Sequence, residues 1–472
     1  MTNHLGELLN LAENSVHYEN GRVKINDSEL LRSLIHKWVS VSTLEDGLLQ
    51  RWARYLVRLT AMEMGIFPAS IHELYMANGR GEISQKFTVP ALNLRVLSFT
   101  AAKAAFKAAQ SINAGALIFE IARSEIGYTA QQPVEFATNI LAAAIATGYK
   151  GPVFIQGDHY QVSLKRYKED PTKEINKIED LILQSVHAGF FNIDVDTSTL
   201  VDITKNDVSE QQQLNIELSA HFTNHIRKNE PEKMTVSVGG EIGEVGGRNS
   251  TEEDLTAYVQ GYNDRLHSEY SDIVGLSKIS IQTGTSHGGI VLPDGSIAEV
   301  KVDFNTLRDL SRVARRKFGL GGTVQHGAST LPEDAFGKFV EFEAVEVHLA
   351  TNFMNMFYEN APQDLTSKMY AYLDKNFKSD RKPDMTDEQF YYKTRKNAIG
   401  PFKKDIFLLE EPFSNKMENL WFKKFSDLFL SLNIKDTWKL VNEITPLGAT
   451  PISLEDYLGT SGSEEDVSDL AD

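Results

Sequence analysis

The chain has 472 residues and carries 48 Lys and Arg against 65 Asp and Glu, which gives a formal net charge of −17. Hydrophobic residues make up 41% and charged residues 24%, values typical of a globular chain with a sizeable core. The excess of acid argues against a protein that neutralises nucleic-acid phosphates or lies on an anionic membrane.

The chain contains no cysteine. Disulfides, cysteine-ligated zinc and a thiol nucleophile are therefore excluded, and any metal site must use His, Asp or Glu. No apolar run approaches the roughly 18–20 residues of a membrane span, and the N-terminus lacks the basic-then-apolar order of a signal peptide. We expect a soluble, cytoplasmic protein with no nucleic-acid or membrane partner.

The first 80 residues have a mainly helical pattern. Apolar residues recur at helical spacing from Ser28 to Met64, as in Leu31, Ile35 and Trp38. A mixed stretch from residue 65 to 81 then connects to the main body. We predict a helical N-terminal extension over residues 1–80.

From Phe87 onward, short apolar runs of strand length alternate with segments of helix length. Near-continuous apolar strands that alternate with helices are typical of a parallel sheet covered by helices. Eight such units are the number that closes a (β/α)8 TIM barrel, which we predict over residues 81–360; a doubly wound open sheet is the alternative. The eight predicted strands are FTVPALN (87–93), GALIFEIA (115–122), PVFIQGD (152–158), FFNIDVD (190–196), TVSVGGE (235–241), SKISIQTG (277–284), GTVQHG (322–327) and AVEVHLA (344–350).

The pattern becomes helical again after Pro362, with charged segments that carry aromatic residues. We predict a helical C-terminal extension over residues 361–460. The last twelve residues, SGSEEDVSDLAD, contain five acids and no base, so we expect a disordered acidic tail over 461–472.

Three of the twelve histidines fall at the ends of three separate predicted strands: His159, His287 and His326. The carboxyl ends of barrel strands meet at one rim, where catalytic groups are found. Three imidazoles with one open position form a catalytic zinc site, which can polarise a carbonyl and stabilise an enolate. Glu241 ends another strand. Asp158 lies beside His159, and its alternative roles are a helix cap or a salt bridge.

The same segments resemble the class II, metal-dependent ketose-bisphosphate aldolases. The likeness extends from about Phe87 to Met356 and rests on several motifs in the family's order. These are FTVPALN, IQGDH, AGFFNIDVDTS, GGEIGEVGG, TSHGG, QHGAS and VHLATNF.

The resemblance implies specific residue roles. His159, His287 and His326 become the zinc ligands, Glu241 a carboxylate that orients or transiently binds the metal, and Asp158 the catalytic acid/base. Backbone groups and hydroxyls at the last two strands are suited to a substrate phosphate. The implied substrate-binding residues are Asn93, Asp196, Gly288, Gly327, Ser329, His348 and Thr351.

Two positions depart from the family pattern. Val291 stands where members usually have a lysine after the second zinc histidine, and His348 stands where the last strand usually has asparagine. Losing a lysine removes a charge-assisted bond to phosphate, and an imidazole differs from an amide in shape and protonation. We therefore predict that fructose 1,6-bisphosphate is a poor or non-physiological substrate.

The predicted function is a zinc-dependent class II aldolase of carbohydrate metabolism, acting reversibly on a phosphorylated ketose to give a triose phosphate and an aldehyde. We expect Zn²⁺ as cofactor, a monovalent cation as optional activator, and a homo-oligomer of two or more chains. A Schiff-base mechanism is disfavoured, since no predicted strand ends in lysine. The alternatives are a non-catalytic accessory subunit on the aldolase scaffold and another metal-dependent reaction on the same barrel.

Overall fold

The computed structural model describes residues 2–83, 86–243, 248–271, 273–284, 302–446, 448, 450, 452–458 and 470. Its centre is a closed barrel of eight parallel strands, as predicted, and β6 pairs with both β5 and β7. That pairing closes the ring and excludes the open sheet. The barrel strands are β4 (Val89–Asn93), β5 (Ile118–Ala122), β6 (Gly151–Gln161), β7 (Asn192–Asp196), β8 (Ser237–Glu241), β9 (Lys278–Ser280), β10 (Thr323–Gln325) and β11 (Glu346–Leu349).

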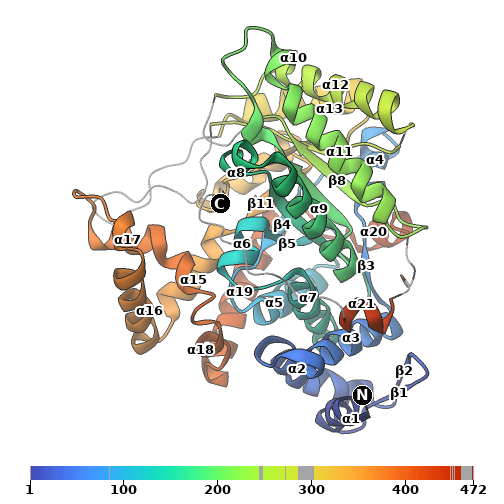
Figure 1. Ribbon diagram of the computed structural model, residues 1–472. Helices are drawn as coiled ribbons and strands as arrows, with labels where there is room; N and C mark the ends of the chain where they lie inside the picture. Colours follow the sequence, from blue (N-terminus) through green and yellow to red (C-terminus); the bar gives the residue numbers. More distant parts are fainter. Residues whose placement is uncertain are drawn as a thin grey trace.

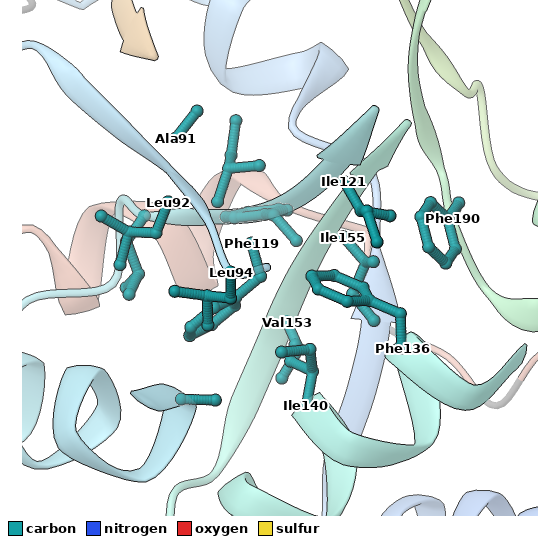
Figure 2. Packing of buried hydrophobic residues seen from close by; sticks show 14 of the residues in the cluster. Ala91, Leu92, Leu94, Phe119, Ile121, Phe136, Ile140, Val153, Ile155 and Phe190 are labelled. Atoms are coloured by element: carbon teal, nitrogen blue, oxygen red, sulfur yellow. The ribbon is translucent and has the colours of Figure 1, made fainter. Parts of the chain in front are cut away.

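Helices cover the outside of the barrel (Figure 1). They are α5 (Ser98–Ser111), α6 (Arg123–Tyr128), α7 (Pro133–Thr147), α8 (Leu164–Glu169), α9 (Pro171–Ala188), α10 (Val208–Gln211), α11 (Gln213–Asn229), α12 (Glu252–Tyr270), α13 (Phe304–Phe318), α14 (Phe336–Glu341) and α15 (Thr351–Asn360). Figure 2 shows Phe136 and Ile140 of α7 beside Ile121, Val153 and Ile155 of the strands. This apolar layer between helices and strands is the main stabilising core, since each buried aliphatic or aromatic side chain contributes about 1.5–3 kcal/mol.

The N-terminal segment is helical as predicted, with three short strands in addition. It comprises α1 (Thr2–Leu11), β1 (Val16–Glu19), β2 (Arg22–Ile25), α2 (Ser28–Leu44), α3 (Gly47–Glu63), β3 (Ile66–Ala69) and α4 (His72–Gly79). β1 and β2 form an antiparallel hairpin, whereas β3 pairs with the first residues of β6. The segment is thus joined to the barrel sheet by backbone hydrogen bonds.

The C-terminal segment packs helices against the barrel. It comprises α16 (Gln363–Asn376), α17 (Asp387–Thr394), α18 (Lys403–Phe407), α19 (Glu411–Ser431), α20 (Trp438–Ile444) and α21 (Leu454–Leu458). α19 lies against α5 and buries Trp421 and Phe425. The predicted acidic tail lies outside the described residues except for Leu470.

No helix in the described part of the chain is both long enough and apolar enough to cross a bilayer.

Candidate functional site

The interior of the barrel has two tiers of polar side chains. Residues two apart on a strand point to the same face, so a polar residue in mid-strand lies one level below the residue at the strand end. The lower tier is Glu120, Gln156, Asp194, Lys278 and Glu346; the upper tier, at the carboxyl rim, includes Asp158, Asp196, Ser280 and His348.

Two of the three predicted histidine ligands meet at the rim. His159 Nε2 lies 2.9 Å from His326 Nδ1, and His159 Nδ1 lies 3.2 Å from Glu241 Oε2. One donor atom from each of these three residues falls within 4.8 Å of the others. Two imidazoles and a carboxylate are a donor set that suits a divalent metal. His287 and Gly288 lie outside the described residues.

A β-bulge in β6 brings Asp158 and His159 to the same pocket. On a regular strand these neighbours would point in opposite directions, but the register shifts between Gly157 and Tyr160, and His159 adopts a φ of +40°. Asp158 Oδ1 consequently lies 3.9 Å from His159 Nε2. Gly157 is required here because a Cβ atom would lie 2.3 Å from the Tyr160 ring.

Hydrogen bonds from neighbouring residues orient both imidazoles. Asp196 Oδ2 lies 3.0 Å from His159 Nδ1 and also accepts from Gln161 Nε2 at 2.9 Å. Ser280 Oγ lies 3.0 Å from His326 Nε2. Such partners fix the ring orientation and basicity of metal-binding histidines. Asp196 therefore lies near the cluster, in contact with His159.

Burial and mutual charge shift the pKa values at the rim. Burial, together with the neighbouring Asp196 carboxylate, raises the pKa of Glu241 to about 7. Burial alone would raise the pKa of Asp158 too, but the positive charges of His159 and His348 outweigh it and hold that pKa well below its usual range. With both imidazoles protonated, Asp158 is therefore ionised, as a proton acceptor must be.

A small cavity of about 30 Å³ lies above these groups, and Asn93, Asp158, His159 and His326 line it. Gly327, Ser329 and Thr351 form another part of its wall. Thr351 is the first residue of α15, so the free N–H groups of that helix begin at the cavity. Ser329 Oγ accepts a 2.7 Å hydrogen bond from the Ala350 N–H, which ties the ends of β10 and β11 together.

Residues 83–404 match the family model of the class II fructose-bisphosphate aldolases. The chain belongs to this family. A fructose-bisphosphate aldolase structure from Campylobacter jejuni is 15% identical, covers 79% of this chain and 97% of its own, and has a TM-score of 0.47. The YdjI aldolase structure from Escherichia coli K12 is 12% identical, covers 73% of this chain and 99% of its own, and has a TM-score of 0.37. The family assignment rests on the family model.

Arg95 is a rim residue that the sequence motifs did not indicate. It lines the cavity and is 8% exposed. Its guanidinium donates to Asn93 Oδ1 at 3.2 Å and lies 2.7 Å from Glu125 Oε1, while Asn93 Nδ2 donates to Glu125 Oε2 at 2.6 Å. Arg95 thus brings a guanidinium, paired with Glu125, to the wall of the cavity. The sequence feature that could have identified Arg95 is its position two residues after Asn93.

His348, the second departure from the aldolase pattern, lies among carboxylates. Its Nε2 lies 2.6 Å from Glu346 Oε1, and its Nδ1 lies 3.2 Å from both Glu120 Oε2 and Asp158 Oδ1. Burial alone would lower the pKa of His348, but Glu120 and Asp158 raise it well above the usual value. Both ring nitrogens thus lie near carboxylates, and these favour the protonated imidazolium form of His348.

Lys278 forms the centre of the lower tier. Its ammonium donates to Gln156 Oε1 at 2.7 Å, Asp194 Oδ2 at 3.0 Å and Glu346 Oε1 at 2.5 Å. Gly239 leaves the space for this contact, because a Cβ there would lie 2.2 Å from Asp194 Oδ1. A buried lysine is thus present at the start of β9, although none of the strands in the described part of the chain ends in one. Ion pairing keeps it protonated, so it is a poor Schiff-base nucleophile.

Proposed function

We propose that this member of the aldolase family is a zinc-dependent lyase that cleaves and forms a carbon–carbon bond beside the carbonyl of a phosphorylated ketose. The observation that carries the proposal is the meeting of His159, His326 and Glu241 at the carboxyl rim, next to a cavity that Asp158, His159 and His326 line. In this proposal His287 completes the metal set. When bound, Zn²⁺ supplies a Lewis acid that polarises a carbonyl oxygen and stabilises the charge that develops there.

The remaining steps are assigned to side chains of this chain. Asp158 takes the proton from the hydroxyl that becomes the aldehyde, since it is ionised and lines the cavity. The electrons of the broken carbon–carbon bond pass into the carbonyl-bearing fragment, and the aldehyde leaves. A proton then returns to the carbanionic carbon to complete the cleavage. Condensation follows the same path in reverse.

Substrate phosphate is assigned to the end of the barrel formed by β10 and β11. Gly327, Ser329 and the N-terminal N–H groups of α15 at Thr351 form an anion cradle of the kind found on TIM barrels. Arg95 adds a guanidinium to the lining of the same cavity. This arrangement supports a phosphorylated substrate over a neutral sugar.

The test is a screen of ketose mono- and bisphosphates against the zinc-loaded protein, read by aldehyde release. We expect release from at least one ketose phosphate, and loss of release in His326→Asn and His159→Asn. Exposed His36→Asn is the matched control and should keep full activity. A protein that binds zinc but cleaves no substrate in the screen would contradict the proposal and favour another metal-dependent reaction on the same barrel. A protein that holds little zinc would favour the accessory-subunit alternative.

We further propose that fructose 1,6-bisphosphate is not the preferred substrate. His348 and its carboxylate partners occupy the place where the family has an asparagine amide, and Val291, outside the described residues, replaces a phosphate-binding lysine. Cleavage rates on fructose bisphosphate and on ketose monophosphates should therefore favour another substrate in the wild type. Efficient fructose bisphosphate cleavage by the wild type would contradict this.

A further inference from the structure

A second cavity, of about 600 Å³, lies outside the barrel strands, where both terminal segments meet the barrel helices. Its walls come from α2 of the N-terminal segment, α5 and α7 of the barrel, and α18 and α19 of the C-terminal segment (Figure 1). Small-molecule sites typically have volumes of roughly 300–1,000 Å³. Because α2, α18 and α19 belong to the terminal segments, the barrel and its own helices do not form this cavity alone.

Apolar side chains form much of the wall. Ile35, Phe99, Ile406 and Phe407 all line the cavity. Ile35 and Ile406 are buried in the core, whereas the two phenylalanines are half-buried. Half-buried aromatic rings at a concave surface favour an apolar ligand, because its binding removes both surfaces from water.

Two lysines of the wall share one carboxylate. Lys103 and Lys107 lie one turn apart on α5 and both line the cavity. Lys103 Nζ lies 2.6 Å from Glu418 Oε2, and Lys107 Nζ contacts the other oxygen of the same carboxylate. The two ammonium groups hold the pKa of Glu418 below its usual value, so that group is ionised. Two positive charges against one negative charge leave this trio with a net positive charge.

A second carboxylate of the wall is shared in the same way. Glu135 of α7 is buried, and its Oε1 lies 2.6 Å from Lys403 Nζ. Its Oε2 lies 3.3 Å from Arg54 Nη2. Glu135 and Lys403 both line the cavity, and Arg54 lies behind Glu135. This trio is also left with a net positive charge.

The other charged side chains of the lining reduce this excess without cancelling it. Among the described residues, Arg32 and Arg95 have carboxylate partners of their own, Glu29 at 3.3 Å and Glu125 at 2.7 Å. Glu411 adds one negative charge at the exposed start of α19. The balance stays positive in a chain whose net charge is −17. Such a cavity attracts anions, in contrast to the rest of the molecule.

The first turn of α5 adds hydrogen-bond donors. Leu97 precedes this helix with a φ of +47°, and no side chain caps the helix start. Ser98, Phe99 and Thr100 of the first turn line the cavity. The N–H groups of a first turn have no partner within the helix and favour an anion. Lys103 follows one turn later on the same helix.

We propose that this cavity binds an organic anion with an apolar body, at a site separate from the catalytic cavity. Lys103, Lys107 and the first turn of α5 hold the anionic group, and the rings of Phe99 and Phe407 hold the apolar body. Arg95 lines both cavities, so the ligand is bound beside one wall of the catalytic cavity. The site goes beyond the proposed aldol reaction and does not depend on it.

The test uses anilinonaphthalene sulfonate, a dye with an aromatic body and one sulfonate, which fluoresces in apolar surroundings. We expect saturable binding of one dye molecule to the full chain. Lys103→Gln and Lys107→Gln should each weaken it about tenfold, the usual effect of losing one charge-assisted hydrogen bond. Ser414→Trp should abolish it, because the indole fills part of the cavity without removing a charge. Lys423→Gln, at an exposed position of α19, should leave it unchanged.

Displacement of the dye tests the two parts of the ligand separately. Octanoate, which has a chain and a charge, should displace the dye. Inorganic phosphate lacks the apolar body and octanol lacks the charge, so each should require about tenfold higher concentrations or more. A wild type with no saturable dye binding would overturn the proposal. Dye binding that is unchanged in Lys103→Gln, Lys107→Gln and Ser414→Trp would overturn it too, since the dye would then lie elsewhere. Equal displacement by octanol and octanoate would show that the cavity does not recognise an anion.

Discussion

Lys278 Nζ lies 2.5 Å from Glu346 Oε1, and both side chains are completely buried inside the barrel. The pair joins two strands that are not neighbours, since β10 separates β9 from β11. Through Glu346 it also reaches His348 at the carboxyl rim. The stability of the barrel centre and the geometry of the site therefore depend on the same ion pair.

Lys278→Met should destabilise the protein by about 3–5 kcal/mol, because it leaves Glu346 and Asp194 buried without their cation. Urea unfolding followed by circular dichroism measures this loss. The control is Lys37→Met, whose ion pair with Glu13 is solvent-exposed and should contribute less than about 1 kcal/mol. In the double variant Lys278→Met/Glu346→Gln the loss should be smaller than the sum of the single losses. Strict additivity would show that the two groups are not coupled.

Ser280→Ala should weaken metal binding by about 10- to 100-fold, because it removes the hydroxyl that orients His326 from 3.0 Å away. Competition with a chromophoric chelator measures the affinity. Ser277→Ala is the matched control: its hydroxyl bonds with Ser237 Oγ at 2.6 Å and touches no histidine of the cluster. Equal affinities of Ser280→Ala and the wild type would show that His326 binds the ion in an orientation that Ser280 does not determine.

Asp158→Asn should lower turnover by about 10²–10⁴-fold, the usual contribution of a positioned proton-transfer group. The amide keeps the shape of the side chain, so the ion at His159 and Glu241 should remain bound. Steady-state cleavage of the best ketose phosphate, with metal content measured on the same sample, gives the result. Asp180→Asn on the exposed face of α9 should leave turnover unchanged. A loss of merely a few-fold in Asp158→Asn would assign the proton transfer to another group.

The sequence was sufficient to predict the barrel, because its eight strands are almost continuously apolar and are covered by helices on the outside. It was less informative about strand ends. β6 continues past the predicted end at Asp158 to Gln161, since the bulge at His159 lets the strand change register and resume pairing with β7. β9 and β10 are shorter than predicted, with three residues each.

The lower tier was missed although its signal is present in the sequence. Glu120, Lys278 and Glu346 interrupt apolar strands, and each stands two residues before a rim position. That spacing predicts an inward-facing charge. The partner of each charge could not be predicted, because Lys278 and Glu346 are separated by 68 residues and meet across the closed barrel. The role of Arg95 was not predicted for the same reason, because its ion-pair partner Glu125 follows a different strand.

His72, at the start of α4, should make the protein less stable in mild acid. Burial, together with the charges of Arg227 and Arg80, lowers the pKa of its imidazole from the ordinary 6.5 to about 4. Among the described residues its Nδ1 has no hydrogen-bond partner, so protonation is not compensated locally.

The sign of this effect follows from proton binding in the two states. Between pH 6.5 and 4 the unfolded chain binds a proton at His72 and the folded chain does not, so stability falls as the pH falls through this window. The stabilisation that comes from a neutral His72 is complete above pH 6.5. By about pH 4 the free energy of unfolding has fallen by about 3 kcal/mol. His72→Gln should show a shallower decrease of unfolding free energy over this range than the wild type, measured by urea unfolding at several pH values. Exposed His36→Gln should keep the wild-type slope, and a wild-type slope in His72→Gln would mean that His72 accepts its proton in the folded state.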